Sequence, residues 1–155
     1  MYVFDTMVLS QQFRFYYRKR FPTLWSYFEA MVEDGRITST REVRRELENS
    51  NDASILVEIN KYNNLFPTPT TIEEDYVGKI FTIRHFRQNI PRKTLLKGGR
   101  NADPWLIARA AIVDGIVVTN EAFREHAAGI PNICRRFGVA YLSFDEFMGT
   151  EGWTF

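Results

Sequence analysis

Four acidic residues could together hold a metal ion: Asp5, Glu46, Asp103 and Glu121. Asp5 directly follows the short apolar run of residues 2–4, and Glu121 lies two residues beyond a Val/Ile-rich strand. Asp103 stands at the start of a predicted helix. In an open parallel sheet, ligands bind beyond the carboxyl ends of the strands, where the amino ends of the returning helices also lie. Asp5, Asp103 and Glu121 are therefore expected to meet at one sheet edge.

Glu46 is expected to reach the same edge from a helix that begins near Thr40. Val43 and Leu47 mark the buried face of this helix, and at about 100° per residue Glu46 lies nearer to that face than Glu42 does. The alternative is that Glu46 is a surface residue paired with a neighbouring Arg. The helix phase nevertheless predicts that Glu46, and not Glu42, belongs to the site.

A divalent cation would balance this cluster of like charges. An acid that ends a buried strand, as Asp5 does, costs on the order of a few kcal/mol unless its charge is paired or bound to a metal. No Lys or Arg is adjacent to Asp5 in the sequence. Oxygen-only ligation favours Mg²⁺ or Mn²⁺ over zinc. Two acids also have structural explanations, since Asp103 before Pro104 is a good helix N-cap and Glu121 could cap a short helix at Ala122.

The segment from Tyr76 to Ala102 is basic throughout. It holds seven Lys or Arg residues and no acid, so the rest of the chain carries a net charge of −6 although the whole chain is +1. Six of these cations lead towards Asp103: Arg84, Arg87, Arg92, Lys93, Lys97 and Arg100. A basic stretch beside an acidic body suggests a polyanionic ligand. The alternative is a solvated helix face followed by a solvated loop.

Residues 13–20 interleave aromatic and basic side chains, reading Phe-Arg-Phe-Tyr-Tyr-Arg-Lys-Arg. Such a segment suits stacking on unpaired bases. It equally suits an amphipathic helix that contacts a partner protein or a second copy of the chain. We favour the protein contact, because Phe and Tyr stripes more often pack against protein than stack on bases.

The apolar periodicity predicts strands separated by helices. Strands are expected at residues 2–4, 36–39, 65–66 (weakly, because Pro67 and Pro69 follow), 116–119 and 139–142. Helices are expected over residues 21–34, 40–49, 53–63, 71–86, 103–114 and 132–137, with short ones from Ala122 and Ser143 and a loop over 88–101. Because the clearest strand is a continuous Val/Ile run, we expect a parallel sheet with helices on both faces. Residues 1–155 are expected to form one α/β domain.

The composition is that of a globular protein. The chain has 155 residues, 45% of them hydrophobic and 25% charged, which is enough for a substantial core. No apolar run approaches the roughly 20 residues that a membrane span needs, and Asp5 comes too early for a signal peptide. Cys134 is the single cysteine, which excludes an intrachain disulfide and a thiolate zinc cluster. We expect a cytoplasmic protein.

At the four acidic positions the sequence resembles PIN-domain nucleases, in particular the VapC-like toxins of prokaryotic toxin–antitoxin pairs. The matching motifs are Val3-Phe4-Asp5-Thr6, Val43-x-x-Glu46-Leu47, Ala102-Asp103-Pro104-Trp105-Leu106-Ile107-Ala108 and Val117-Val118-Thr119-x-Glu121. Their order and spacing span nearly the whole chain. The resemblance implies a PIN-like sheet of about five parallel strands, with the first strand central and the fourth beside it.

The resemblance also implies a metal-dependent endoribonuclease that hydrolyses phosphodiester bonds in single-stranded or looped RNA. Asp5 and Asp103 are then the expected direct ligands of Mg²⁺ or Mn²⁺, and Glu46 and Glu121 complete the coordination or hold metal-bound water. The hydroxyls of Thr6 and Thr119 are expected to orient the carboxylates. The six cations from Arg84 to Arg100 are expected to bind RNA. The expected partners are a cognate antitoxin that blocks the site and possibly a second copy in a homodimer.

Two positions depart from the family pattern. Met7 stands where family members usually carry a small polar residue, and Glu121 stands where Asp is commoner. Met7 favours the leading alternative, a catalytically weak or inactive PIN-like module that binds RNA or protein. A second alternative is a receiver-type phosphoacceptor domain, which needs a Lys after the last strand. Here residues 139–142 run into Ser143-Phe144-Asp145 without one, which disfavours that class.

Overall fold

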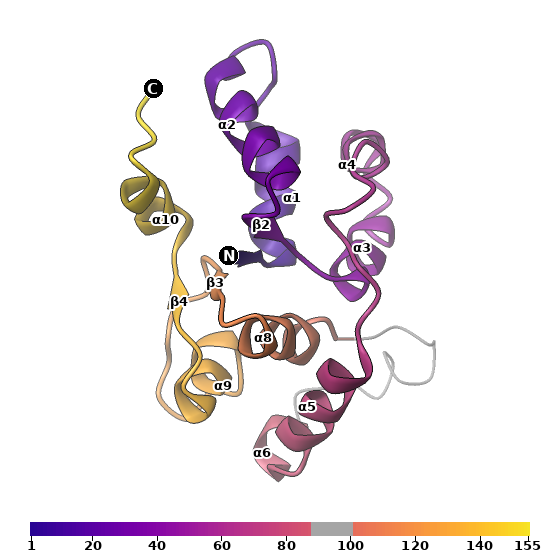
Figure 1. The fold of residues 1–155 in the computed structure, drawn as a ribbon, viewed down its shortest axis with the longest axis vertical. Coiled ribbons are helices and arrows are strands. Elements are labelled where there is room, and N and C mark those ends of the chain that lie inside the picture. Colours follow the sequence, from indigo (N-terminus) through magenta and orange to yellow (C-terminus); the bar gives the residue numbers. More distant parts are fainter. Residues whose placement is uncertain (88–100) are drawn as a thin grey trace.

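Short strands and longer helices alternate along the chain in the computed structural model, which describes residues 1–87 and 101–155 (Figure 1). The strands are β1 (Tyr2–Phe4), β2 (Ile37–Thr38), β3 (Ile116–Val118) and β4 (Tyr141–Leu142). The helices are α1 (Thr6–Phe15), α2 (Pro22–Glu33), α3 (Arg41–Glu48), α4 (Ala53–Ile59), α5 (Thr71–Phe81), α6 (Arg84–Arg87), α8 (Asp103–Ile112), α9 (Ile130–Phe137) and α10 (Phe144–Glu151). The predicted α/β class is confirmed.

The strands form one parallel sheet in the order β2-β1-β3-β4. The central position of the first strand, with the 116–118 strand beside it, is confirmed. In register, Phe4 lies opposite Val118, and Val118 lies opposite Leu142. The carboxyl ends of β1, β3 and β4 therefore share one edge, and the residues that follow each strand emerge there.

The described residues hold four strands and not the expected five, because residues 65–66 do not form a strand. This segment still lies along the end of β2, where the Ser39 amide donates to the Leu65 carbonyl (2.8 Å) and the Arg41 amide donates to the Pro67 carbonyl (3.0 Å). A ladder cannot continue from Pro67, since proline has no amide hydrogen to return. The weak fifth strand is thus an extended segment with one-sided hydrogen bonds.

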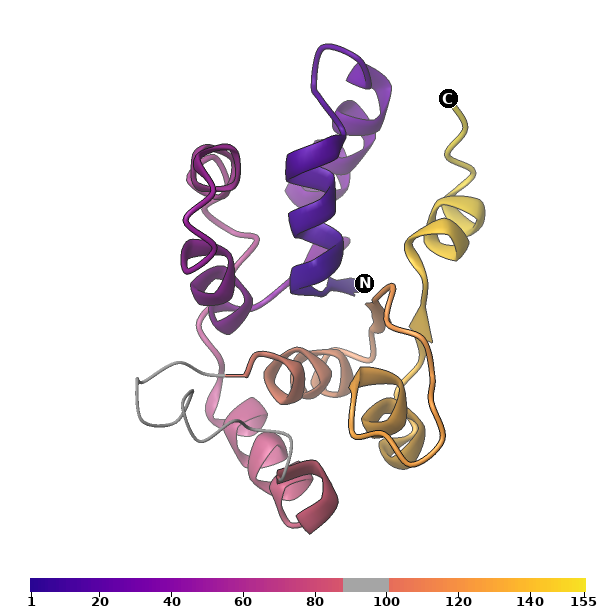
Figure 2. The same ribbon diagram turned by 180° about the vertical axis from the view of Figure 1, so that it is seen from behind.

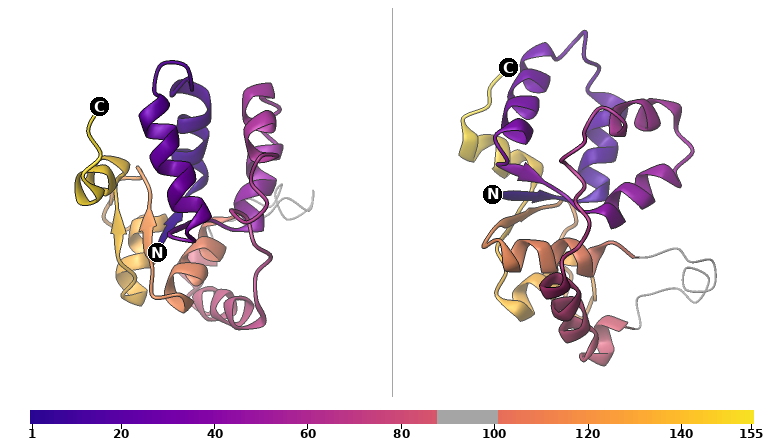
Figure 3. Two further views of the ribbon diagram at one scale, coloured as in Figure 1. Left: turned by 45° about the horizontal axis from the view of Figure 1, so that its top comes forward. Right: turned by 45° about the vertical axis from the view of Figure 1, so that its right-hand side comes forward.

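Helices cover both faces of the sheet, as predicted (Figure 3). On one face, the rings of Tyr2 and Phe4 pack edge-on against Phe147 of α10, with centroids 4.8 and 5.1 Å apart, and Phe4 also meets Phe28 of α2. On the other face, α8 packs on β1 and β3 and is flanked by α9. Val3 and Phe4 are completely buried between these layers. Figure 2 shows α1 rising from the end of β1 and α8 lying across below it.

Several predicted helix boundaries are wrong. Asp103 is the first residue of α8 and not its N-cap, which is Ala102. Residues 120–129 contain no helix, so the short helix expected at Ala122 is absent. The helix expected over 71–86 is divided into α5 and α6. A separate finding is that no helix in the described part of the chain is long and apolar enough to cross a membrane.

Candidate acidic site

Asp5 has the smallest exposed fraction of the four acids. It is 3% exposed, and its amide continues the sheet by donating to the Val118 carbonyl (3.1 Å). Its carboxylate accepts short hydrogen bonds from the Thr119 hydroxyl and from the Met7 amide, so it also caps α1. The expected orienting role of Thr119 therefore corresponds to a direct contact between the ends of β1 and β3.

Glu46 joins α3 to the start of α8. Its Oε1 accepts a hydrogen bond from the Ala102 amide at 2.7 Å, next to Asp103. The buried hydroxyl of Thr6 makes a looser interaction with the Glu46 carboxylate. Three chain segments, at residues 5–6, 46 and 102–103, thus meet beyond the carboxyl end of β1.

Glu46 was expected to lie nearer the buried face of α3 than Glu42, and this expectation is wrong. Glu42 is completely buried and pairs with Arg41 (2.8 Å) and Arg45 (3.2 Å), whereas Glu46 is only partly buried. The reason is that α3 packs against α1, α4 and α8, so more than one of its faces is covered. Glu46 nevertheless is the residue that faces α8.

Glu121 approaches from the loop that follows β3. Its amide donates to the Thr119 hydroxyl (3.1 Å), and its Oε2 accepts from the Ile130 amide (3.2 Å) at the start of α9. Gly129 permits this approach, since a Cβ there would stand 1.8 Å from Glu121 Oε1. Glu121 therefore caps α9 and not a helix at Ala122, and this structural task is compatible with a place in the site.

The four carboxylates interact electrostatically. Burial, together with the charges of Glu46, Asp5 and Glu121, raises the pKa of Asp103 to about 8. Burial likewise raises the pKa of Asp5 to about 6, against the lowering effect of its hydrogen bonds from Thr119 and Met7. Burial also raises the pKa of Glu46. The acids expected to meet at this edge thus lie close enough to disfavour one another's charged forms.

Cys134 of α9 lies beneath this cluster and was not predicted to be near it. Burial raises the pKa of its thiol to about 12, and Asp103 and Glu121 add to the effect. The thiol is therefore neutral and acts as part of the apolar floor. Its sequence context carries no signal of this proximity, because α9 is brought there by tertiary packing alone.

The oxygen donors fit Mg²⁺ or Mn²⁺ in chemical type, but their side chains are turned to other partners. Within residues 1–87 and 101–155, no three Asp, Glu, His or Cys side chains are gathered as ligands of one ion. Asp5, Glu46 and Glu121 each accept hydrogen bonds from backbone amides instead. The N-cap of α8 is Ala102 and not Asp103, so the helix-cap explanation for Asp103 is wrong.

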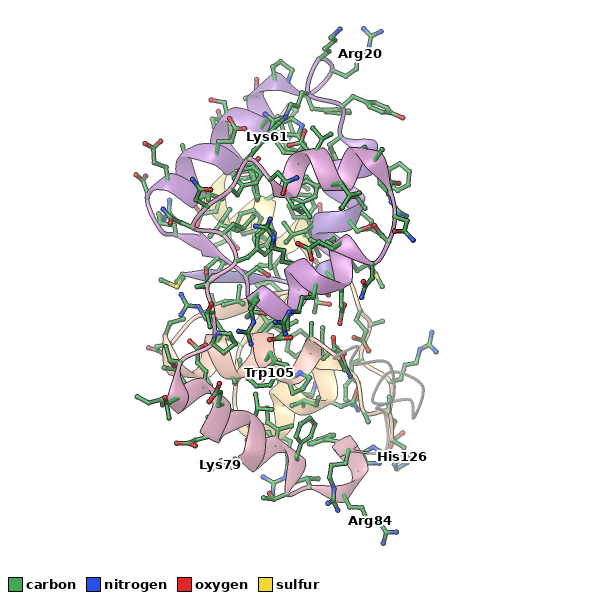
Figure 4. The ribbon with its side chains drawn as sticks, turned by 90° about the vertical axis from the view of Figure 1, so that its right-hand side faces the viewer. Arg20, Lys61, Lys79, Arg84, Trp105 and His126 are labelled. Atoms are coloured by element: carbon green, nitrogen blue, oxygen red, sulfur yellow. The ribbon has the colours of Figure 1, made fainter. Side chains whose placement is uncertain are left out.

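The predicted RNA-binding cations are divided between two parts of the chain. Arg84 and Arg87 lie on α6 and are exposed. Arg92, Lys93, Lys97 and Arg100 lie outside the described residues. Figure 4 shows Arg84 at the end of the molecule where His126 also lies.

The aromatic and basic segment 13–20 is partly structural. The Phe13 ring is buried and stacks on Trp25 and Tyr62. The Arg18 guanidinium lies 4.1 Å from the centroid of the Trp25 ring and forms an ion pair with Glu58 at 2.8 Å. Its charge is therefore paired within the protein. The exposed aromatic residues of this segment are Phe15 and Tyr17.

Comparison with known proteins places the chain in a family. No curated protein and no solved structure matches it. One family model matches residues 2–155, which is nearly the whole chain. The chain therefore belongs to the family described as a domain of unknown function, DUF4411.

Proposed function

We propose that this protein is a metal-dependent endoribonuclease with a PIN-like acidic site formed by Asp5, Glu46, Asp103 and Glu121. The observation that carries the proposal is the meeting of these acids, from separate chain segments, at the carboxyl edge of a parallel sheet, where the pKa values of Asp5 and Asp103 are raised. Groups with strongly shifted pKa values that gather at such an edge are typical of functional sites. Among the described residues, no Lys or Arg forms an ion pair with Asp5 or Asp103.

The residues support a division of roles. Asp103 is the acid best placed to bind an ion directly, because it is not the N-cap of α8 and, among the described residues, its backbone amide and not its carboxylate makes the hydrogen bond at this helix start. Asp5 is fixed by Thr119 and the Met7 amide, so its orientation survives changes around it. Glu46 and Glu121 would exchange a backbone hydrogen bond for a metal-bound water. Mg²⁺ or Mn²⁺ held by these oxygens would lower the pKa of a bound water and stabilise charge on the phosphoryl oxygens.

The proposal extends to the substrate and the biological setting. The basic character of residues 76–102 supports RNA as the polyanion. The resemblance to VapC-like toxins supports a cytoplasmic toxin that is inhibited by a cognate antitoxin protein. A homodimer is a further part of this proposal, with the exposed side chains of Phe15 and Tyr17 as apolar surface for a protein contact.

An RNA-cleavage assay with purified protein tests the proposal. We expect cleavage of single-stranded RNA with Mg²⁺ or Mn²⁺ and none with EDTA. Asp103→Asn should reduce the rate by two orders of magnitude or more, in line with the roughly 10²–10³-fold cost of losing one charge-stabilising group. Asp75→Asn, an exposed change of the same kind on α5, is the matched control. Equal rates in the Asp103 and Asp75 variants would remove the acidic site from the reaction.

The second candidate function is a PIN-like module that binds RNA or protein without cleaving it. The observation in its favour is that Asp5, Glu46 and Glu121 are all engaged with backbone amides. Calorimetric titration with Mn²⁺ separates the two functions. Binding that is lost in Asp103→Asn supports the nuclease, whereas RNA binding with no metal affinity supports the module.

A further inference from the structure

We propose that a groove beside the acidic site is a subsite for one nucleotide of single-stranded RNA, in which Arg124 and His126 bind phosphate and Met7 supports the base. The inference rests on the proposed function for its choice of RNA, and it adds residues that the motifs did not indicate. Glu121 of the acidic site lines the groove, as does Met7, whose backbone amide holds Asp5, so a strand lying in the groove would reach the edge of the acidic site.

The groove has the size and lining of a ligand site. Its volume is about 690 Å³, within the roughly 300–1,000 Å³ of small-ligand pockets. Its walls come from the start of α1, from α6 and from residues 120–129, here called the 120–129 loop. The lining residues that matter most are Met7, His85, Glu121, Arg124 and His126.

The 120–129 loop is held in place by side chains from other elements. Asn132 of α9 donates to the Arg124 carbonyl (2.8 Å), and a His85 ring nitrogen of α6 lies 3.1 Å from the Ala127 carbonyl. Arg135 of α9 lies 3.6 Å above the Phe123 ring. A loop without regular structure is thereby fixed at both flanks, and the wall that carries Arg124 and His126 is formed before any ligand binds.

The charges of this wall suit a phosphate group. Among the described residues no carboxylate pairs with the Arg124 guanidinium, and residues 88–100 contain no acid. The His126 side chain is 88% exposed, and among the described residues its ion-pair neighbour is the similarly exposed Glu125, 3.8 Å away. Arg84 and Arg87 lie exposed on α6, which contributes His85 to the groove, and Figure 4 shows Arg84 and His126 at the same end of the molecule. A phosphate here would meet the donors of Arg124 and His126 in the groove that Glu121 also lines.

Met7 supplies the apolar part of the groove. Its backbone amide is committed to Asp5, but its side chain is 49% exposed and lines the groove. A thioether is polarisable and packs well against aromatic rings. The Met7 side chain, which departs from the family pattern, can thus pack against a base, while the Met7 amide still donates the hydrogen bond that orients Asp5.

The test is the affinity of the full-length chain for a fluorescein-labelled 12-nucleotide single-stranded RNA, measured by anisotropy with Ca²⁺ in place of Mg²⁺ to suppress turnover. Arg124→Gln should weaken binding at least fivefold and reduce the salt-dependence slope by about 0.7, the value for one phosphate contact on a single strand. Met7→Ala should weaken binding about threefold, and Met7→Leu should restore most of it. Lys61→Gln, an exposed change of equal charge in the part of the molecule away from Arg84 and His126 (Figure 4), should bind as the unmodified chain does.

The outcomes separate this inference from the proposed nuclease function. Arg124→Gln that binds with unchanged affinity and slope overturns the subsite, even if Asp103-dependent cleavage is observed. Equal losses in Arg124→Gln and Lys61→Gln also overturn it, because general attraction would then explain binding. Selective loss in the Arg124 and Met7 variants of a chain that never cleaves RNA supports the subsite and contradicts the nuclease. A chain that binds no RNA contradicts the subsite.

Discussion

Two sets of buried carboxylates in this protein are treated in opposite ways. Glu73 is 2% exposed and bonds Arg109 at 2.9 Å, joining α5 to α8. Burial alone would raise the pKa of Glu58, but hydrogen bonds from Arg18 and Lys61 bring it below its usual value. At the carboxyl edge of the sheet, Asp5 and Asp103 are held among like charges and hydrogen-bond donors, and their pKa values rise.

Buried Glu58 and Glu73 are thus paired with Arg or Lys side chains. At the sheet edge, no such cation pairs with Asp5 or Asp103 among the described residues. A buried pair with good geometry is a structural feature whose partners stabilise each other. A cluster of acids without cations is unfavourable for folding and is compensated by whatever the site binds. The contrast can be broken by experiment, from the largest expected effect to the smallest.

The largest effect should follow from breaking an arginine pair. Arg109→Met leaves Glu73 buried without its cation, and breaking a buried pair typically costs about 3–5 kcal/mol. We expect a loss of that order in the free energy of unfolding, measured with urea. Asp103→Asn should keep the free energy of unfolding or raise it, because it removes a like charge from the cluster. Similar losses in both variants would mean that the two sets of acids do not differ.

The second effect separates Glu46 from Glu42. Glu46→Gln should reduce RNA cleavage by an order of magnitude or more, since loss of a charge-stabilising group in a site costs about 2.7–4 kcal/mol in comparable cases. Glu42→Gln should retain cleavage and lose stability, because Glu42 is buried against Arg41 and Arg45. The reverse pattern, with cleavage lost only in Glu42→Gln, would place the wrong face of α3 at the site.

The third effect is the dependence of stability on pH. The folded pKa values of Asp103 and Asp5, about 8 and 6, lie above the ordinary value of 3.8. Above pH 4 the folded state therefore binds protons that the unfolded state has lost. The free energy of unfolding should fall as pH rises, until the folded pKa of each group is passed. The Glu58 pair acts with the opposite sign, because its pKa is lowered and its stability is lost as pH falls.

Urea denaturation in metal-free buffer at pH 5, 6, 7 and 8 measures this dependence. Asp103→Asn should flatten the decline between pH 6 and 8, where Asp103 is the titrating member. Asp75→Asn is again the control and should follow the unmodified chain. Added Mn²⁺ should also flatten the decline if the carboxylates bind it. A stability that rises from pH 6 to 8 would contradict the raised pKa of Asp103.

The sequence correctly predicted the site residues whose positions follow directly from the strands. Asp5 and Thr119 each follow a short apolar strand, and parallel pairing leaves little freedom in where they emerge. Glu42 was misjudged because helical periodicity identifies one buried face, while α3 is covered on several. The groove was missed because the 120–129 loop has no periodicity, and remote side chains such as Asn132 and His85 hold it.

The smallest effect concerns Met7 and the way in which Asp5 is held. Asp5 depends on the backbone amide of residue 7 and on Thr119, not on the Met7 side chain. Met7→Asn keeps that amide, so affinity for Mn²⁺ should change less than about twofold when measured by calorimetry. Thr119→Val removes a hydrogen bond to a charged group, which is worth roughly 1.5–3 kcal/mol, and should change Mn²⁺ affinity more. A larger change in Met7→Asn than in Thr119→Val would show that the side chain at position 7 belongs to the acidic site.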